Sequence, residues 1–435
     1  MTAAGVSPAR ACAYAVIRRV FEHGAYADRA LNAEAAGLDP RDRALAMALA
    51  YGTVQRRATL DHVASVLCSR PLAELDPPVL SALRLGLLQL LLLDGIAEHA
   101  AVNESVELLK AGGRGGAGLV NAVLRRATRE GRAILDRLSD ETAADAAILH
   151  SVPDWLAELW WRELGPEPAR ALLRRINEPA ESALRVNTLV ASVDSAEREL
   201  AELGVGATRV PGQPEALVLQ DPFDVHGSGL WARGAVMAQS RGSMRVGSTL
   251  EPAPGERVLD LCAAPGAKTT QLAALMNDEG TVTGVERHPG RARALERTLQ
   301  RMHVTCASVV LADATAVREG ERRYDRVLVD PPCSGLGTLQ SRPDLRWRTN
   351  PERIAELVGL QARILRAGAA VIRPGGTLVY SVCTISRAES EDLIDRFLVE
   401  NGDFAAENLD QGPYLRLLPH LHGTDGFFIA RLRRG

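Results

Sequence analysis

The stretch that decides the fold is Val258-Leu259-Asp260-Leu261-Cys262-Ala263-Ala264-Pro265-Gly266-Ala267-Lys268-Thr269-Thr270. An apolar run, a turn of small residues and a new helical run predict a strand that enters a helix through a tight loop. Small side chains let a ligand lie against the backbone, and the N–H groups that open the helix can bind an anion. A nucleotide or a carboxylate would fit there. The segment has neither the P-loop spacing nor GxGxxG, and the alternative is an ordinary strand–helix turn.

The chain around this turn alternates between strands and helices from about Thr249 onward. The predicted strands are 257–261, 281–285, 307–311, 326–329 and 377–381, and the predicted helices are 268–276, 290–302 and 353–372. This alternation is typical of a parallel, doubly wound α/β sheet, in which ligands bind at the carboxyl ends of the strands.

Polar and thiol side chains follow several of these strands. Glu286 lies about 20 residues after the glycine turn, where an acid suits ribose hydroxyls, although a strand-end carboxylate is often merely solvated. Asp313 ends the third strand. The run Asp330-Pro331-Pro332-Cys333-Ser334-Gly335 follows the fourth strand, and Ser381-Val382-Cys383-Thr384 ends the fifth. A lone cysteine is usually a small buried apolar residue, but two at the ligand-binding edge of one sheet favour chemistry.

The rest of the chain predicts two further domains. Helical spacing recurs at 11–21, 43–55, 79–93, 102–109 and 119–127, so the first 140 residues are expected to be helical. Between 152 and 247, helices at 153–164, 167–177 and 195–203 mix with strands at 183–189, 216–219 and 235–238. We therefore predict an all-α domain over 1–145, a small α+β linker subdomain over 146–247, and an α/β Rossmann-like domain over 248–435.

Charge and cysteine usage restrict the possible partners. The formal net charge is -3, which argues against a protein that coats nucleic acid indiscriminately. A local basic cluster nevertheless surrounds a glycine loop, and it is either an RNA-binding face or a solvated helix surface; its members are Lys110, Arg114, Arg125, Arg126, Arg129 and Arg132.

The six cysteines form no CxxC pair, so neither zinc nor a disulfide framework is expected. The N-terminus does not resemble a signal peptide, and the apolar run 79–96 is interrupted by Arg84 and Gln89. We predict a cytoplasmic monomer without metal or membrane contact.

Four motifs together resemble the Sun (Fmu) family of RNA cytosine-5 methyltransferases. They are DLCAAPGAKTT, DPPCSGLG, YSVCTIS and the terminal Asp425-Gly426-Phe427-Phe428. Residues 102–126 are similar to the RNA-binding NusB fold, so the resemblance covers nearly all 435 residues. The combination implies an S-adenosylmethionine-dependent enzyme that methylates C5 of a cytosine in RNA, with small-subunit (16S) ribosomal RNA as the expected target. The alternatives are the same chemistry on tRNA or large-subunit rRNA, and a non-catalytic NusB-like RNA-binding factor.

The resemblance also implies roles for individual residues. Cys383 is the expected nucleophile, Cys333 is expected to help release the product, and Asp330 is expected to contact both cofactor and base. The implied cofactor site comprises Cys262, Ala263, Ala264, Pro265, Gly266, Ala267, Lys268, Glu286, Asp313 and Asp330. The implied RNA-binding residues of the helical domain are Arg114, Arg125, Arg126 and Arg129.

The chain departs from the family pattern in three places. Ala267 stands where glycine is usual, which adds only a methyl group. Gln239-Ser240 stands where the family often has Gln-Asp, so no role of that aspartate carries over. The nucleophile motif reads Cys383-Thr384-Ile385 rather than the commoner Thr-Cys-Ser, and the cysteine keeps its place after the strand.

Overall fold

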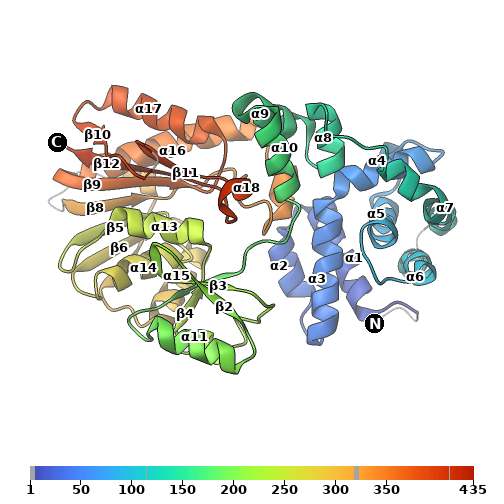
Figure 1. Cartoon of the computed structure of the whole chain (residues 1–435), viewed down its shortest axis with the longest axis horizontal. Helices are drawn as coiled ribbons and strands as arrows, with labels where there is room; N and C mark the ends of the chain where they lie inside the picture. Colours follow the sequence, from blue (N-terminus) through green and yellow to red (C-terminus); the bar gives the residue numbers. More distant parts are fainter. Residues whose placement is uncertain (1–4, 114, 318–322, 411) are drawn as a thin grey trace. The chain divides into compact units, whose positions relative to one another are not determined.

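The computed structural model describes residues 5–113, 115–317, 323–410 and 412–435, and Figure 1 traces the chain. It divides into two compact units. Unit 1 comprises Met1–Glu178 and Leu339–Asn350, and unit 2 comprises Pro179–Thr338 and Pro351–Gly435. The division of the sequence at residues 145 and 247 stays a prediction.

Unit 1 is helical, as predicted. Its helices are α1 (Pro8–His23), α2 (Ala27–Glu34), α3 (Pro40–Gln55), α4 (Arg57–Leu67), α5 (Pro77–Leu91), α6 (Glu98–Ala111), α7 (Ala117–Leu135), α8 (Ala143–His150), α9 (Asp154–Leu164) and α10 (Pro166–Arg175), with a 3-10 turn η1 (Leu72–Glu74). Local sequence sets several starts: Asp39 caps α3 by accepting from the N–H of Asp42, and prolines occupy the first turns of α1, α3 and α5. The short helices α2, α4 and α8 were not predicted individually, because so few turns give a weak period.

A segment distant in sequence completes unit 1. The 3-10 helix η3 (Pro343–Trp347) carries Arg346, whose side chain is fully buried. Its Nη1 donates to the carbonyl of Ser151 at 3.0 Å and to Asn177 Oδ1 at 3.1 Å, and its Nη2 donates to other carbonyls of the unit. Burial lowers the pKa of Arg346 to about 9. Backbone carbonyls and Asn177 therefore bind both Nη atoms of this guanidinium, whereas its buried Nε has no hydrogen-bond partner among the described residues. No periodicity in the sequence predicts this arrangement.

Unit 2 contains a small antiparallel sheet in the order β2-β3-β1-β4. Its strands are β1 (Ala183–Val186), β2 (Ala207–Val210), β3 (Gln213–Leu219) and β4 (Val236–Ala238), and its helices are α11 (Val193–Glu202) and α12 (Gly229–Ala232). The expected α+β character is confirmed. β2 was not predicted because none of its four residues is buried, which leaves no apolar alternation to detect.

The large sheet of unit 2 has the order β10-β12-β9-β8-β5-β6-β7, with β11 paired to β12. Its elements are α13 (Arg241–Leu250), β5 (Arg257–Leu261), α14 (Ala267–Leu275), β6 (Thr281–Glu286), α15 (Pro289–Arg301), β7 (Ala307–Leu311), η2 (Ala314–Ala316), β8 (Tyr324–Val329), α16 (Pro351–Val371), β9 (Ile372–Val382), η4 (Arg387–Glu389), α17 (Glu391–Glu400), β10 (Phe404–Ala406), β11 (Tyr414–Leu417), α18 (Pro419–His422) and β12 (Phe427–Arg434). Strands β5 to β9 are parallel, which confirms the doubly wound prediction. β10 to β12 add an antiparallel edge that was not predicted.

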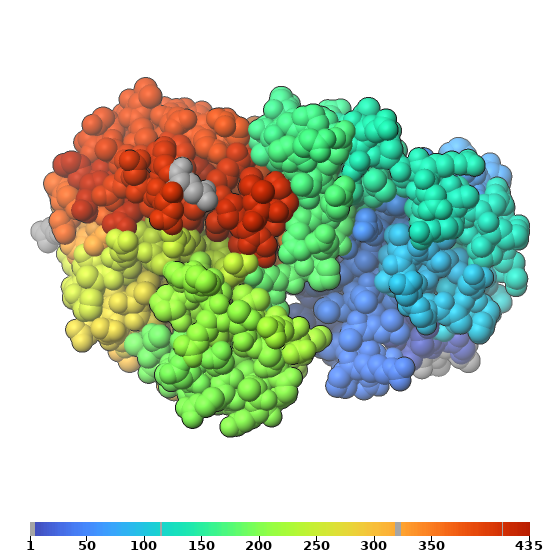
Figure 2. Space-filling model, in the orientation of Figure 1, coloured from blue at the N-terminus to red at the C-terminus, as the bar shows by residue number. Residues whose placement is uncertain are grey.

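The central strands of the sheet are buried on both faces. Leu259 and Val327 face one core with residues of α16 and α17, while Val258 and Leu328 face the other with residues of α13, α14 and α15. Figure 1 shows these two helical layers on opposite sides of the strands. On the face shown in Figure 2, side chains of the C-terminal segment (red) lie against those around α13 (yellow-green).

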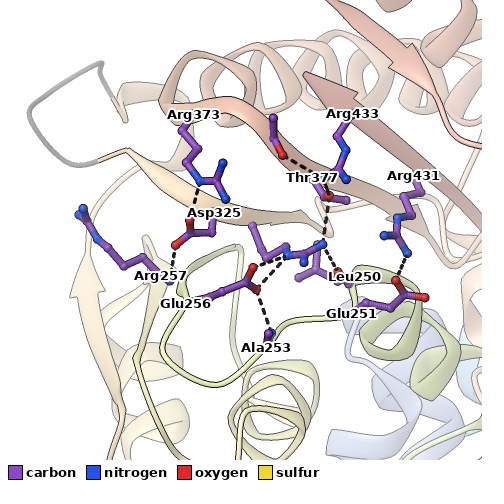
Figure 3. Close-up of polar contacts among 12 residues, drawn as sticks. Leu250, Glu251, Ala253, Glu256, Arg257, Asp325, Arg373, Thr377, Arg431 and Arg433 are labelled. Atoms are coloured by element: carbon purple, nitrogen blue, oxygen red, sulfur yellow. Dashed lines mark hydrogen bonds and ion pairs between the residues drawn. The ribbon is translucent and has the colours of Figure 1, made fainter. Parts of the chain in front are cut away.

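The amino ends of the parallel strands are joined by ion pairs (Figure 3). Asp325 accepts from the backbone N–H of Arg257 at 2.8 Å and pairs with Arg373 at 2.6 Å. Arg326 pairs with Glu256 at 2.9 Å and donates to Thr377. This network holds the amino-terminal parts of β5, β8 and β9 together. It does not involve the carboxyl ends of these strands.

Candidate active site

The carboxyl edge of the parallel strands gathers the residues singled out in the sequence. The strand order reverses at β5, because β6 lies on one side of it and β8 on the other. Such a switch point is where doubly wound sheets bind ligands. The turn 262–266 follows β5, Glu286 ends β6, Asp330 follows β8 and Cys383 follows β9.

The turn after β5 has a backbone that excludes larger residues. Gly266 has φ 109°, and a Cβ at this position would lie 2.7 Å from Leu295 Cδ1. Gly266 is also the residue that precedes the first turn of α14, so the free N–H groups of that helix lie beside it. Burial raises the pKa of the Cys262 thiol to about 12, which keeps it uncharged. The predicted tight turn is confirmed in its local geometry.

A cavity of about 180 Å³ opens beside this turn. It is lined by Cys262, Val285, Glu286, Arg287, His288, Arg291, Ala312, Asp313, Ala314, Pro332, Leu360 and Ile364. Glu286 is buried there; its Oε1 accepts from the N–H of His288 at 2.9 Å, and its Oε2 lies 3.4 Å from Arg291 Nε. Asp313 is more open, and hydrogen bonds from Thr315 lower its pKa. Two carboxylates above apolar walls suit the hydroxyls and ring of a nucleoside.

Lys268 and Asp330 form an ion pair at the centre of the edge. Lys268 Nζ lies 2.8 Å from Asp330 Oδ2, and Ser381 Oγ donates to Asp330 Oδ1 at 2.8 Å. Burial alone would lower the pKa of Lys268, but the charge and hydrogen bond of Asp330 outweigh it, so the pKa is raised. The Phe427 ring lies 5.5 Å from Nζ. The lysine is thus a fixed positive charge between the turn and the thiols.

The two strand-end cysteines meet. Cys333 Sγ lies 3.3 Å from Cys383 Sγ, and both cysteines are free rather than disulfide-bonded. The hydrogen bond with Cys383 raises the pKa of Cys333 well above its ordinary value, and burial adds to this. The Cys333 thiol therefore resists ionisation in this site.

The terminal motif supports the cysteine loops through the backbone. Gly337 N–H donates to the carbonyl of Cys383 at 3.0 Å, and Gly426 N–H donates to the carbonyl of Gly337 at 2.8 Å. A Cβ on Gly337 would lie 2.0 Å from the Gly426 oxygen, so only glycine fits this crossing. The Asp425-Gly426-Phe427-Phe428 motif therefore has a structural role, because its Gly426 holds the loop of Gly337 in place. The sequence did not reveal this role.

Gln239 and Ser240 contact helices α14 and α13: Gln239 donates to Gln271 of α14 at 3.1 Å, and Ser240 precedes α13. Ser240 caps α13, and Gln239 accepts from the buried Arg185 of β1 at 2.8 Å. Arg185 in turn donates to Thr270 of α14 at 2.8 Å, and burial lowers its pKa to about 10. The small sheet thereby supports α14, a contact that sequence analysis missed because Arg185 stands in an otherwise apolar strand.

The candidate RNA-binding arginines lie on α7 of unit 1. Arg126 pairs with Glu130 at 2.7 Å, whereas Arg125 donates to Asn121 and Arg129 to the Arg125 carbonyl. Arg125 also lines an open groove of about 840 Å³ with Lys110. Arg114 lies outside the described residues.

Within the described chain no cluster of His, Cys, Asp or Glu could hold a metal ion, and every described helix is too short or too polar to span a bilayer.

Comparison with known proteins decides the family. The profile described as "16S rRNA methyltransferase RsmB/F" matches residues 247–433, the NusB family profile matches 7–129, and a ferredoxin-like domain of RsmF/B-like methyltransferases matches 152–226. Ribosomal RNA small subunit methyltransferase B of Klebsiella pneumoniae is 33% identical over 428 residues, which are 97% of each chain. The chain belongs to the ribosomal RNA small subunit methyltransferase B family.

Other relatives agree with this membership. A Synechocystis protein is 37% identical over 446 residues, which cover 98% of this chain and 99% of the relative. The crystal structure of PH0851 superposes with a TM-score of 0.84 at 26% identity, over 99% of both chains. A methyltransferase homologue from Pyrococcus horikoshii has a TM-score of 0.62 at 29% identity and covers 68% of this chain. The predicted three-part fold is confirmed, and membership of the methyltransferase B family implies S-adenosylmethionine as the methyl donor.

Proposed function

We propose that the chain methylates C5 of a cytosine in small-subunit ribosomal RNA, with Cys383 as the covalent nucleophile. The observation that carries the proposal is the pair of thiols 3.3 Å apart at the carboxyl edge, beside a cavity that suits a nucleoside. A methyltransferase acting on an amine or hydroxyl would need no such pair. RNA as the substrate rests on the family and on the NusB-like helices.

A thiol nucleophile is needed because C5 of cytosine does not react directly with a methyl donor. C5 of cytosine is too weak a nucleophile, but addition of a thiolate at C6 makes C5 an enamine-like carbon. Loss of the C5 proton after methylation lets the C6–S bond break and restores the ring. Two adjacent thiols share this work in the proposal: Cys383 forms the bond to C6, and Cys333, which resists ionisation, assists at release.

The residues of the turn and of the cavity would hold the cofactor, from Cys262 to Lys268 together with Glu286 and Asp313. When bound, S-adenosylmethionine supplies an electrophilic methyl group. Lys268 holds Asp330 in place by their ion pair. We propose that Asp330, fixed from both sides by Lys268 and Ser381, presents its carboxylate to the cytosine edge.

A denaturing gel tests the division of labour. Incubation with small-subunit rRNA and cofactor should leave a denaturant-resistant protein–RNA complex for Cys333→Ala, because the adduct forms but is released poorly. Cys383→Ala should give neither complex nor methylation. If the trapped complex appears with Cys383→Ala instead, the roles of the two cysteines are reversed. If it appears with neither variant, Cys333 is not needed for product release. Bisulfite sequencing of total RNA from a deletion strain then identifies the target, and a lost mark in tRNA or large-subunit rRNA would overturn the small-subunit assignment.

A further inference from the structure

A buried carboxylate lies behind the two cysteines. Glu389 of η4 is fully buried, and it was not singled out in the sequence. Its Oε1 accepts from Ser334 N–H at 2.8 Å, and its Oε2 from Ser334 Oγ at 2.5 Å and from Thr384 Oγ1 at 3.2 Å. Ser334 directly follows Cys333, and Thr384 directly follows Cys383. One side chain therefore binds both cysteine loops.

A third element joins the same carboxylate. Gln361 of α16 donates through Nε2 to Glu389 Oε1 at 3.0 Å and to the carbonyl of Pro332 at 3.0 Å. The Glu389 carbonyl accepts from Tyr380 of β9 at 2.8 Å. Each group that faces the two carboxylate oxygens can donate a hydrogen bond, a set that suits a carboxylate acceptor. Burial raises the pKa of Glu389, and the hydrogen bonds from Ser334, Gln361 and Thr384 act against that rise. Taking such a group out of water is costly unless several donors compensate.

We propose that Glu389 is a positioning residue that holds the Cys333 and Cys383 loops together and so fixes the placement of their two thiols. The proposal rests on the proposed function for the roles of the thiols, but its geometry does not. Without the carboxylate, Ser334 and Thr384 lose their shared acceptor. The loops then stay joined by the hydrogen bond between Ser334 Oγ and Thr384 Oγ1 at 2.7 Å, by the contact of the two thiols and by the backbone bond from Gly337 to Cys383.

The carboxylate also acts through its charge. It is among the groups that raise the pKa of Cys333, after the hydrogen bond with Cys383 and burial, and Asp330 contributes in the same direction. The other ionisable groups around the pair are Lys268, which interacts with Cys383, and Tyr380. Removing the charge of Glu389 should thus ease ionisation of Cys333 while Lys268 and Asp330 stay in place.

The test compares Glu389→Gln with Glu391→Gln in the full chain. Glu391 is a matched control because it lies two residues away, is largely buried and pairs with Arg416 at 3.4 Å. Each thiol is titrated without RNA by its rate of iodoacetamide labelling against pH, read by mass spectrometry. In Glu389→Gln, the labelling profile of Cys333 should shift to lower pH. In Glu391→Gln, it should match that of the wild type. For methylation, kcat should fall roughly 10- to 100-fold, because small misplacements of reacting groups are costly, while KM for S-adenosylmethionine stays within about twofold.

Ser334→Ala provides a second route if Glu389→Gln does not fold. It removes one donor and changes little volume, and it should lower kcat in the same direction; if both variants fold, their effects should be less than additive because they break one contact. Unchanged labelling and kcat in the folded variants would overturn the positioning role. A shifted Cys333 profile without any methylation in the wild type would instead preserve the positioning role and contradict the proposed function.

Discussion

The carboxyl edge of the large sheet and helix α7 both concentrate charge, but they do so in opposite ways. At the edge, partners come from distant segments: Asp330 contacts Lys268, 62 residues away, and Ser381, 51 residues away. On α7 the ion pairs join residues four apart on the same helix, as between Arg126 and Glu130, although Arg126 also donates to the carbonyl of Leu67 at 2.7 Å. Buried, distant pairs fix a geometry, whereas exposed local pairs contribute little to stability and mainly carry net charge. Changes at the edge should therefore have large, position-specific effects, and changes on α7 small, additive ones.

The largest effect is expected at the cofactor turn. Gly266→Val adds a branched side chain at φ 109°, where its Cβ alone would meet Leu295 at 2.7 Å. We expect S-adenosylmethionine affinity to fall by more than about 100-fold, measured by calorimetry, because the turn must move to relieve the contact. Gly255→Val is the control, since Gly255 also has a positive φ of 85° but nothing lies within 4 Å of an added Cβ. Wild-type affinity in folded Gly266→Val would contradict the assignment of the turn.

A medium effect is expected from pH at Asp260. This buried carboxyl accepts from Thr269 at 2.7 Å, and burial raises its pKa from 3.8 to about 7. The folded form holds its proton more tightly than the unfolded form, so this residue costs stability increasingly as pH rises from about 4 to about 7. Asp260→Asn should gain stability relative to wild type between pH 5 and 8, by at most about 4 kcal/mol.

The measurement for Asp260 is the difference in free energy of unfolding between variant and wild type at several pH values. Glu130→Gln on α7 is the matched control: its pKa is lowered by the hydrogen bond from Arg126, so it loses its proton below this window. Its difference should be flat from pH 5 to 8. A flat line for Asp260→Asn as well would show that the buried carboxyl does not titrate there.

The smallest effect is expected on α7. Arg125 and Arg129 hydrogen-bond to neutral groups, although the charge of Arg129 also helps to lower the pKa of Glu130. Arg126 and Arg132 instead form ion pairs with Glu130 and Asp136. If α7 binds RNA, replacing Arg125 and Arg129 with Ala should reduce the slope of log affinity against log salt by about 1.4 to 1.8, or 0.7 to 0.9 per lost phosphate contact. The double variant of Arg126 and Arg132, which removes equal charge, should change the slope less. Slopes equal to that of the wild type in both variants would make α7 only a solvated surface.

The sequence by itself determined the parallel strands, the turn after β5 and the placing of both cysteines at one sheet edge. These follow from local patterns, because an apolar strand, a glycine turn and a helix start each depend on neighbouring residues. It also predicted the helical N-terminal region, where long helices such as α5 give a clear period.

Only the tertiary structure decided how these parts meet. Glu389 lies in a polar stretch with no motif of its own, and its contacts join three segments that chain order does not bring together. Arg346 lies in Leu339–Asn350, a segment that belongs to unit 1 although the chain on both sides of it belongs to unit 2. The antiparallel strands β10 to β12 are short or irregularly patterned; β12 forms by pairing with β9, and β10 and β11 form by pairing with β12. The physical reason is common to all three. A buried polar group or an edge strand is stable only in contact with its partner, and the fold rather than the adjacent residues brings that partner into place.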